Sequence, residues 1–388
     1  MTEQALDLIV RNGRVINPAE NVDAMLDVGV QEGRIAAIGP GIEASPETRT
    51  LDASGCLVLP GLIDFHTHIF YGGPWGVDPD ALGPRTCVIT MVDCGTAGAG
   101  NFHGFLRHVI QRSSIRIYAF LHIAFTGLDH AIWFPENLII GELEDPRRAM
   151  VGPAVEVGHR YPEIIRGIKV RASADASGNN GVQAISLAQQ VAKTLGLPLM
   201  VHVALPPPTL KEILALLRPG DILTHAFRGA PNSLLGKNGS VLQEAWEAKE
   251  RGIFFDIGHG CGGFAFKTGQ KLIDEYGFLP DTISSDVHTY SINGPAYDLL
   301  TTMSKFLALG MPLTDVVKAT TATPAKILGL EETMGNLSPG RTADISVVKM
   351  VENPTAFEDG FGKTLSANRF LVPDTTIKEG KILWSAES

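Results

Sequence analysis

Two histidines, His66 and His68, stand one residue apart directly after the apolar residues Leu62 and Ile63. On an extended strand, residues two apart point to the same face of the sheet. The two imidazoles can therefore aim at one point, and neutral imidazole is the commonest protein ligand for a metal ion. A lone His-x-His pair also occurs simply as two polar residues at a strand end, so the metal interpretation depends on the rest of the chain.

From about residue 60 onward, short apolar segments alternate with helical patterns. The eight candidate strands cover residues 61–66, 87–93, 115–124, 164–170, 198–203, 221–226, 252–257 and 281–286. Amphipathic spacing and apolar content predict helices over 181–195, 209–217, 295–309 and 312–320. This alternation predicts an α/β fold, a (β/α)8 TIM barrel, with a doubly wound sheet as the alternative.

Polar side chains at the ends of several different strands favour the barrel. These residues are His66, His68, Lys169, His202, His225 and Asp286. In a barrel the C-terminal strand ends meet at one mouth, where these side chains outline a site for two metal ions. Taken singly, each has an ordinary explanation: His202 and His225 as core histidines, Lys169 as an ion-paired lysine, Asp286 as a helix cap. Their coincidence on five strands favours the shared site.

Both ends of the chain carry a different pattern. In residues 1–59, Asn12-Gly13 predicts a hairpin turn between short strands. In residues 336–388, strands are predicted at 345–349, 370–372 and 381–384. We expect the two ends to form one small β-sandwich domain, with residues 60–335 as the catalytic barrel.

Composition narrows the class of protein further. The chain has 388 residues, 44% of them hydrophobic and 19% charged, as in a compact globular protein. A net charge of −10 without a long basic run argues against nucleic acid or an anionic membrane as partner. The start, Met1 to Gln4, has no basic region ahead of an apolar core, so we expect no secretory signal. Four cysteines without a regular spacing fit free thiols in the cytoplasm.

The segment from Pro60 to His68, together with Lys169, His202, His225 and Asp286, resembles the amidohydrolase superfamily. The resemblance covers nearly the whole chain, because 11–16 and 340–345 resemble the split β-sandwich of that family. It implies two divalent metal ions, usually zinc. It implies that His66, His68 and Asp286 bind one ion, that His202 and His225 bind the other, and that a carboxylated Lys169 bridges both.

Within the superfamily, the chain looks most like the deacetylase branch, often labelled dihydroorotase-like. The segments that carry this likeness are 92–98, 167–173, 255–260 and 284–288. True dihydroorotases place an arginine two residues after the His-x-His pair, where this chain has Phe70. The resemblance implies hydrolysis of acetylated small carboxylic acids, either O-acetyl 2-hydroxy acids of mandelate type or N-acetyl amino acids. The alternatives are a cyclic-amide hydrolase of the hydantoinase or dihydroorotase kind, a dipeptidase, or a metal-free scaffold or binding protein.

Residues around the expected metal site suggest further roles. Asp286 is the expected general base, which passes a proton from water to the leaving group. Arg171 shares a strand face with Lys169 and is a candidate clamp for a substrate carboxylate, with a plain ion pair as the alternative. Cys94 stands at the end of the second predicted strand, but Lys169 already supplies the bridge, so we expect this thiol either to lie behind the metal ligands or to be inert. The loop residues that we expect to line the substrate pocket are His288, Tyr290, Asn293 and Gly260. The sequence is compatible with a homo-oligomer and does not predict the oligomeric state.

Overall fold

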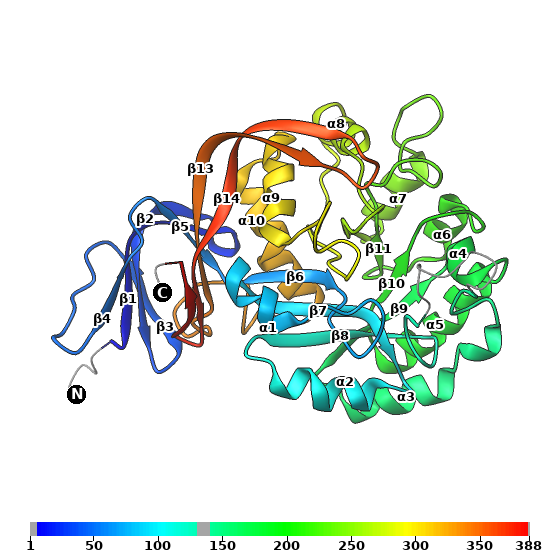
Figure 1. Ribbon diagram of the computed structural model, residues 1–388, viewed down its shortest axis with the longest axis horizontal. Helices are drawn as coiled ribbons and strands as arrows, with labels where there is room; N and C mark the ends of the chain where they lie inside the picture. Colours follow the sequence, from blue (N-terminus) through cyan, green and yellow to red (C-terminus); the bar gives the residue numbers. More distant parts are fainter. Residues whose placement is uncertain (1–5, 130–139, 387–388) are drawn as a thin grey trace.

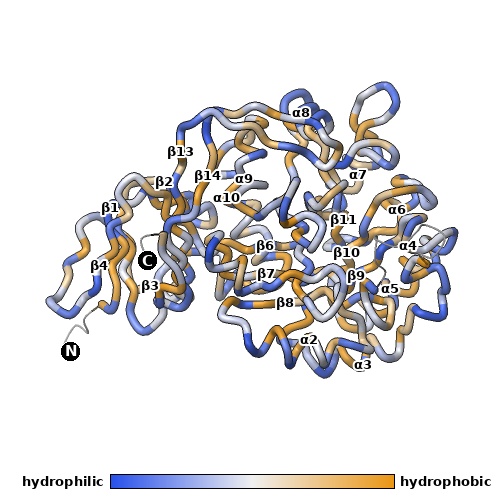
Figure 2. Tube along the Cα trace, viewed as in Figure 1, coloured by the Kyte–Doolittle hydropathy of each residue, from blue (hydrophilic) through white to orange (hydrophobic). Residues whose placement is uncertain are grey.

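The computed structural model describes residues 6–129 and 140–386, arranged around two separate sheets (Figure 1). One sheet is parallel and flanked by helices, and the other is built from both ends of the chain, drawn in blue and red. The expectation of no secretory signal rests on residues 1–4, which lie outside the described residues. Figure 2 shows hydrophobic residues along the strands of the parallel sheet, where the main core lies.

The parallel sheet follows the sequence order from β6 to β12. Its strands are β6 (Leu62–Thr67), β7 (Val88–Gly98), β8 (Arg116–His122), β9 (Ile165–Arg171), β10 (Leu199–His202), β11 (Ile222–Thr224) and β12 (Phe254–Phe255). Each of the seven falls on a predicted strand. Nearly every residue in them is buried, as expected of parallel strands that are covered on both faces.

Residues 282–287 take the place of the eighth strand, predicted at 281–286. This segment forms isolated parallel bridges on both sides, between Asp256 and Thr282 and between Thr67 and Val287. It therefore closes the ring between β12 and β6, which confirms the TIM barrel. The segment is not a regular strand, and Asp286 near its end has a φ of +48°, outside the extended region of the backbone.

Helices connect the barrel strands. The main ones are α2 (Phe102–His108), α3 (Val151–Arg160), α5 (Gly181–Leu195), α6 (Leu210–Leu216), α7 (Gln243–Glu250), α8 (Phe266–Asp274), α9 (Leu299–Ala308), α10 (Leu313–Thr320) and α11 (Ala322–Ile327), with single-turn α1 (Pro79–Leu82) and α4 (Ala174–Ser177). The predicted helix 295–309 begins later than expected, because the Asp298 carboxylate accepts from Thr301 N and caps α9. Among the described residues, no helix has the length and apolar character to cross a membrane.

The second sheet has the order β15-β14-β13-β5-β1-β2-β3, with β4 beside β1. Its strands are β1 (Leu8–Asn17), β2 (Val22–Gln31), β3 (Arg34–Gly39), β4 (Arg49–Asp52), β5 (Cys56–Pro60), β13 (Ile345–Glu358), β14 (Thr364–Lys378) and β15 (Lys381–Ser385). Strand β5 pairs with both β1 and β13, so the two chain ends share one sheet. The β-sandwich is thus confirmed, while the division of the chain at 59/60 and 335/336 stays a prediction.

Strands β13 and β14 are much longer than predicted. Their hairpin leaves the sandwich and arches over the barrel to reach α8 (Figure 1). At its tip, Phe266 N donates to the Asp359 carboxylate at 2.8 Å, and Gly360 N donates to Phe264 O at 3.0 Å. The sequence did not reveal this extension, because its largely exposed middle has no regular apolar pattern.

Candidate metal centre

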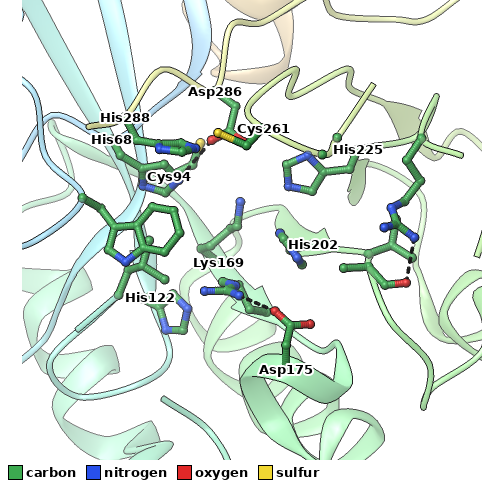
Figure 3. A pocket seen from close by; sticks show the side chains of 18 residues that line it. His68, Cys94, His122, Lys169, Asp175, His202, His225, Cys261, Asp286 and His288 are labelled. Atoms are coloured by element: carbon green, nitrogen blue, oxygen red, sulfur yellow. Dashed lines mark hydrogen bonds and ion pairs between the residues drawn. The ribbon is translucent and has the colours of Figure 1, made fainter. Parts of the chain in front are cut away.

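The six predicted ligands meet at the C-terminal mouth of the barrel, as the strand-end pattern requires. Figure 3 shows five residues, His68, Lys169, His202, His225 and Asp286, around one cavity, which all five line. His66 lies fully buried beneath it, with its Nε2 3.0 Å from the Lys169 amine. Polar side chains buried this deeply need partners or a bound ion.

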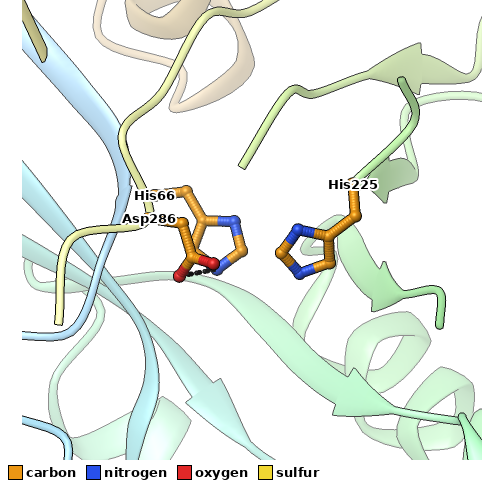
Figure 4. A group of neighbouring side chains, drawn as sticks. All are labelled: His66, His225 and Asp286. Atoms are coloured by element: carbon orange, nitrogen blue, oxygen red, sulfur yellow. Dashed lines mark ion pairs between the residues drawn. The ribbon is translucent and has the colours of Figure 1, made fainter. Parts of the chain in front are cut away.

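Three of these residues bring donor atoms close enough together to share in holding metal. His66, His225 and Asp286 each offer a donor atom, and the three atoms lie within 4.8 Å of one another (Figure 4). His68 joins them, because its Nε2 lies 3.2 Å from Asp286 Oδ1. The His202 ring lies 4.4 Å from the His225 ring, between centroids. The structure therefore brings all six predicted ligands together.

The histidines are oriented by hydrogen bonds at Nδ1, which leaves Nε2 for an ion. The Nδ1 partners are Thr224 Oγ1 for His66 at 2.8 Å, Thr96 Oγ1 for His68 at 2.9 Å and Gly258 O for His225 at 2.7 Å. Metal-binding histidines characteristically have their second nitrogen held in this manner. Two further atoms, His202 Nε2 and Asp286 Oδ1, are buried without a hydrogen bond to any described residue.

The protonation states also suit metal binding. Burial lowers the pKa of His202 well below its ordinary value, which favours the neutral imidazole. Burial raises the pKa of Asp286, but the neighbouring His66 and His68 outweigh it and hold that pKa well below the usual range. Burial lowers the pKa of Lys169, which favours a neutral amine. A neutral amine is the form that reacts with CO2 to give a carbamate.

Two ligands sit on strained backbone. His225 and Asp286 have φ values of +63° and +48°, a region that residues other than glycine rarely occupy and that costs roughly 1–3 kcal/mol. Gly260 makes room for the second of them, since a Cβ there would lie 2.3 Å from Asp286 Oδ2. Such strain persists where the surrounding structure enforces it, which is typical of functional sites.

Asp256, which sequence reasoning did not assign to the site, organises the ligands from below. One of its carboxylate oxygens accepts from Thr282 and Ser284, both at 2.7 Å. The other accepts from Thr224 at 2.7 Å and faces His66 Nδ1 at 3.2 Å. The Asp256 carboxylate thus connects the ends of the seventh and eighth barrel segments to His66. Asp256 lies near the end of the predicted strand 252–257, and this position could have marked it as a site residue.

Above the ligands lies a cavity of about 200 Å³, smaller than the roughly 300–1,000 Å³ of pockets that take drug-sized ligands. Arg171 and His288 line it, as predicted. Gly260, Tyr290 and Asn293 are not among the described residues that line it, so their contact with substrate stays a prediction. The Tyr290 ring instead packs edge-on against Trp75, at 5.0 Å between centroids.

Sequence reasoning missed several wall residues, among them Trp75, His122 and Arg228. His122 ends β8 just as the assigned histidines end their strands, so the same signal was present. Arg228 follows His225 by three residues, on a loop with no periodic pattern. Cys94 also lines the cavity, but its thiol donates to Phe65 O at 3.4 Å, and burial raises its pKa well above the ordinary value. We therefore expect this thiol to stay protonated.

Imidazole nitrogens and a carboxylate beside a buried lysine fit a pair of divalent cations such as zinc. A ligand set of this kind at a TIM-barrel mouth is typical of a metal-dependent hydrolase. Comparison with known proteins agrees, since residues 268–383 match the Amidohydrolase family. The chain is 38% identical to a deacetylase of Brucella anthropi over 96% of this chain and 91% of that protein. This protein belongs to the amidohydrolase superfamily and is a hydrolytic enzyme.

Other relatives and solved structures carry several different names within related chemistry. A deacetylase of Agrobacterium fabrum is 38% identical over 88% of this chain and 82% of its own length. A dihydroorotase of Geobacter metallireducens matches over only 16% of this chain and 15% of its own length. Among solved structures, one described as an adenine deaminase has a TM-score of 0.88 and 31% identity, covering 98% of this chain and 100% of its own. A second solved structure, described as a dihydroorotase, has a TM-score of 0.87 and 34% identity, and the match covers 98% of each chain.

Proposed function

We propose that this enzyme uses two divalent metal ions, zinc in our proposal, to hydrolyse small acetylated carboxylic acids. The substrates would be O-acetyl 2-hydroxy acids of mandelate type or N-acetyl amino acids. The observation that carries the proposal is the near full-length similarity to proteins named deacetylases, in a chain whose cavity joins the metal-ligand set to two arginines. The two arginines in the wall of the cavity favour an anionic substrate, although the net charge of the whole chain is −10.

Six side chains would hold the ions. We propose His66, His68 and Asp286 for one ion, His202 and His225 for the other, and Lys169, carboxylated, between them. When bound, such ions polarise the acyl carbonyl and lower the pKa of a water molecule. Neutralising the buried Lys169 amine as a carbamate also avoids the cost of an ammonium in an apolar site.

Asp286 would move the proton. Water attacks the acetyl carbonyl carbon, and the bond from that carbon to the leaving oxygen or nitrogen breaks. The Asp286 carboxylate accepts the proton of the water and delivers it to the leaving atom, which gives acetate and a free hydroxy or amino acid. His288 stands next to this path, 6.1 Å from His68 between ring centroids, and burial lowers its pKa to about 4. It would therefore act as a neutral hydrogen-bonding group for the substrate.

The surroundings of Phe70 support the proposal that this enzyme is not a dihydroorotase. Its ring packs against Phe105 at 5.1 Å between centroids, and it does not line the cavity among the described residues. The position that is arginine in true dihydroorotases therefore offers no charge to a substrate here. The free thiols of all four cysteines support a cytoplasmic location as part of the same proposal.

A substrate panel tests the proposal. It would contain O-acetyl and N-acetyl acids in both enantiomers, with dihydroorotate, hydantoin, adenine and a β-aspartyl dipeptide as competing classes. We expect turnover of acetylated acids, with a preference for one enantiomer, and little or none of the competitors. Hydrolysis of a cyclic amide or dipeptide at a higher kcat/KM than any acetylated acid would overturn the proposed function.

A further inference from the structure

Arg228 is a buried cation in the wall of the cavity, on the loop that follows His225. It is only 7% exposed, and it lines the same cavity as His202 and Asp286. Two backbone carbonyls, Ala204 O at 2.9 Å and Pro231 O, accept from its Nη1. The head of the side chain is thus fixed in place by the loops after β10 and β11.

Within residues 6–129 and 140–386, no carboxylate forms an ion pair with Arg228. Its Nη2 has no hydrogen bond to a described residue, and its Nε is buried without one. Arginine stays charged in proteins, and a buried charge without a counter-ion is costly. Guanidinium groups bind carboxylates through parallel N–H donors, so an anion in the cavity is the natural partner.

Arg171, the other arginine of the cavity, differs in this respect. Its Nη2 donates to the Asp175 carboxylate at 2.8 Å, and its Nε lies 3.6 Å from a carboxylate oxygen of buried Glu142. Its guanidinium also lies 6.0 Å from the Trp75 ring centroid. Two protein carboxylates therefore lie within ion-pair distance of Arg171, whereas Arg228 has none within that distance among the described residues and interacts with Asp175 only at longer range.

We infer that Arg228 is the principal binding group for the carboxylate of the substrate, in a cavity that takes a small monoanionic acid. The acyl group then lies at the metal ligands while the acid group pairs with Arg228 across the cavity. Arg171 contributes a smaller share, because its charge is already partly compensated. The identity of the acyl group in this inference rests on the proposed function. The binding of an acid group by Arg228 does not depend on it.

The test compares an acetylated 2-hydroxy acid with its neutral carboxamide counterpart. Arg228→Gln removes the charge and keeps an amide donor for the backbone carbonyls. We expect its kcat/KM for the acid to fall on the order of 100-fold, as when a buried charge pair is broken, and that for the carboxamide to change by less than about threefold. Arg228→Lys, which keeps the charge but loses the planar donor pair, should recover part of the acid activity.

Arg166→Gln is the matched control. Arg166 lies on β9 with its guanidinium 5.5 Å from the Tyr118 ring centroid, and it does not line the cavity. Its substitution should leave the acid-to-carboxamide ratio unchanged. If Arg228→Gln lowers kcat/KM equally for the acid and the carboxamide while the melting temperature is unchanged, Arg228 serves only to hold the loops. The inference is then overturned.

A binding measurement separates this inference from the proposed function. Calorimetric titration of the metal-loaded enzyme with the free 2-hydroxy acid needs no turnover. We expect Arg228→Gln to weaken this binding at least tenfold, while Arg166→Gln leaves it unchanged. If the wild-type enzyme hydrolyses no acetylated acid but shows this loss, the proposed function fails and the carboxylate site stands. Equal binding by wild type and Arg228→Gln overturns the carboxylate site, whatever the substrate panel gives.

Discussion

The two sides of the cavity are built in different ways. On the ligand side, His66, Lys169 and His202 lie on barrel strands whose ladders fix their positions. On the substrate side, Trp75, Arg228 and the 261–263 segment come from loops between strands and helices. The ladder dictates where a ligand can stand, whereas the loops are free to differ in length and composition. Related barrels can therefore keep the metal site and change the substrate.

Lys169→Ala tests the ligand side with the largest expected effect. If Lys169 bridges two ions as we propose, its loss should reduce the bound metal to one equivalent or less and lower kcat by more than about 10⁴-fold, because both ions would lose a shared ligand. Elemental analysis and initial rates measure the two effects. Addition of a short carboxylic acid should partly restore activity. A variant with full metal content and full activity would remove Lys169 from the centre.

Asp286→Asn tests proton transfer on the same side. The amide keeps the shape of the side chain but cannot accept the proton, so we expect kcat to fall by roughly 10²–10⁴-fold, with much of the metal retained. Stopped-flow or steady-state rates with metal-loaded protein provide the measurement. If kcat changes only a few-fold, another group moves the proton, and His288 is the nearest candidate.

The same contrast explains what the sequence could predict. Strand-end spacing predicted that His66, His68, Lys169, His202 and Asp286 lie together, and the structure brings them to one mouth because parallel strands in a barrel bring their C-terminal ends together. The irregular eighth segment and the positive φ of Asp286 follow from tertiary contacts, which no local pattern encodes. Arg228 and Trp75 lie in loops, whose paths depend on the packing of the residues around them. The length of the β13–β14 hairpin could not be predicted for a similar reason, since β14 packs on α9 and the tip of the hairpin hydrogen-bonds to the start of α8.

Arg171→Met tests the substrate side. Because Asp175 and Glu142 already share the charge of Arg171, we expect KM for an acetylated acid to rise about tenfold, which is less than for Arg228→Gln. KM for the matching methyl ester should hardly change. Steady-state kinetics with both substrates give the answer. Equal losses for acid and ester would make Arg171 a structural residue.

Lys305 offers the mildest test, since it lies beneath the loop that carries Gly260. Its amine contacts His259 Nε2 at 2.8 Å and donates to Pro295 O at 2.6 Å, and burial lowers its pKa from 10.5 to about 7. Between pH 7 and 10.5 the unfolded chain therefore binds one more proton at this residue than the folded chain does. The free energy of unfolding gains up to about 1.4 kcal/mol per pH unit from Lys305 as pH rises through this window.

Lys305→Met removes this contribution. We expect the slope of unfolding free energy against pH to be smaller in the variant by up to about 1.4 kcal/mol per unit between pH 8 and 10, with little change in kcat at neutral pH. Urea denaturation of both proteins at several pH values measures the slopes. Identical slopes would mean that the lysine keeps an ordinary pKa in the folded state.

The metal content of the purified enzyme tests the central claim most directly. Elemental analysis should find close to two equivalents of divalent metal per chain, zinc in our proposal. A chelator should abolish hydrolysis of an acetylated acid, and the added metal should restore it. A metal-free protein that keeps full activity in the presence of chelator would contradict the assignment of the six ligands and the function built on them.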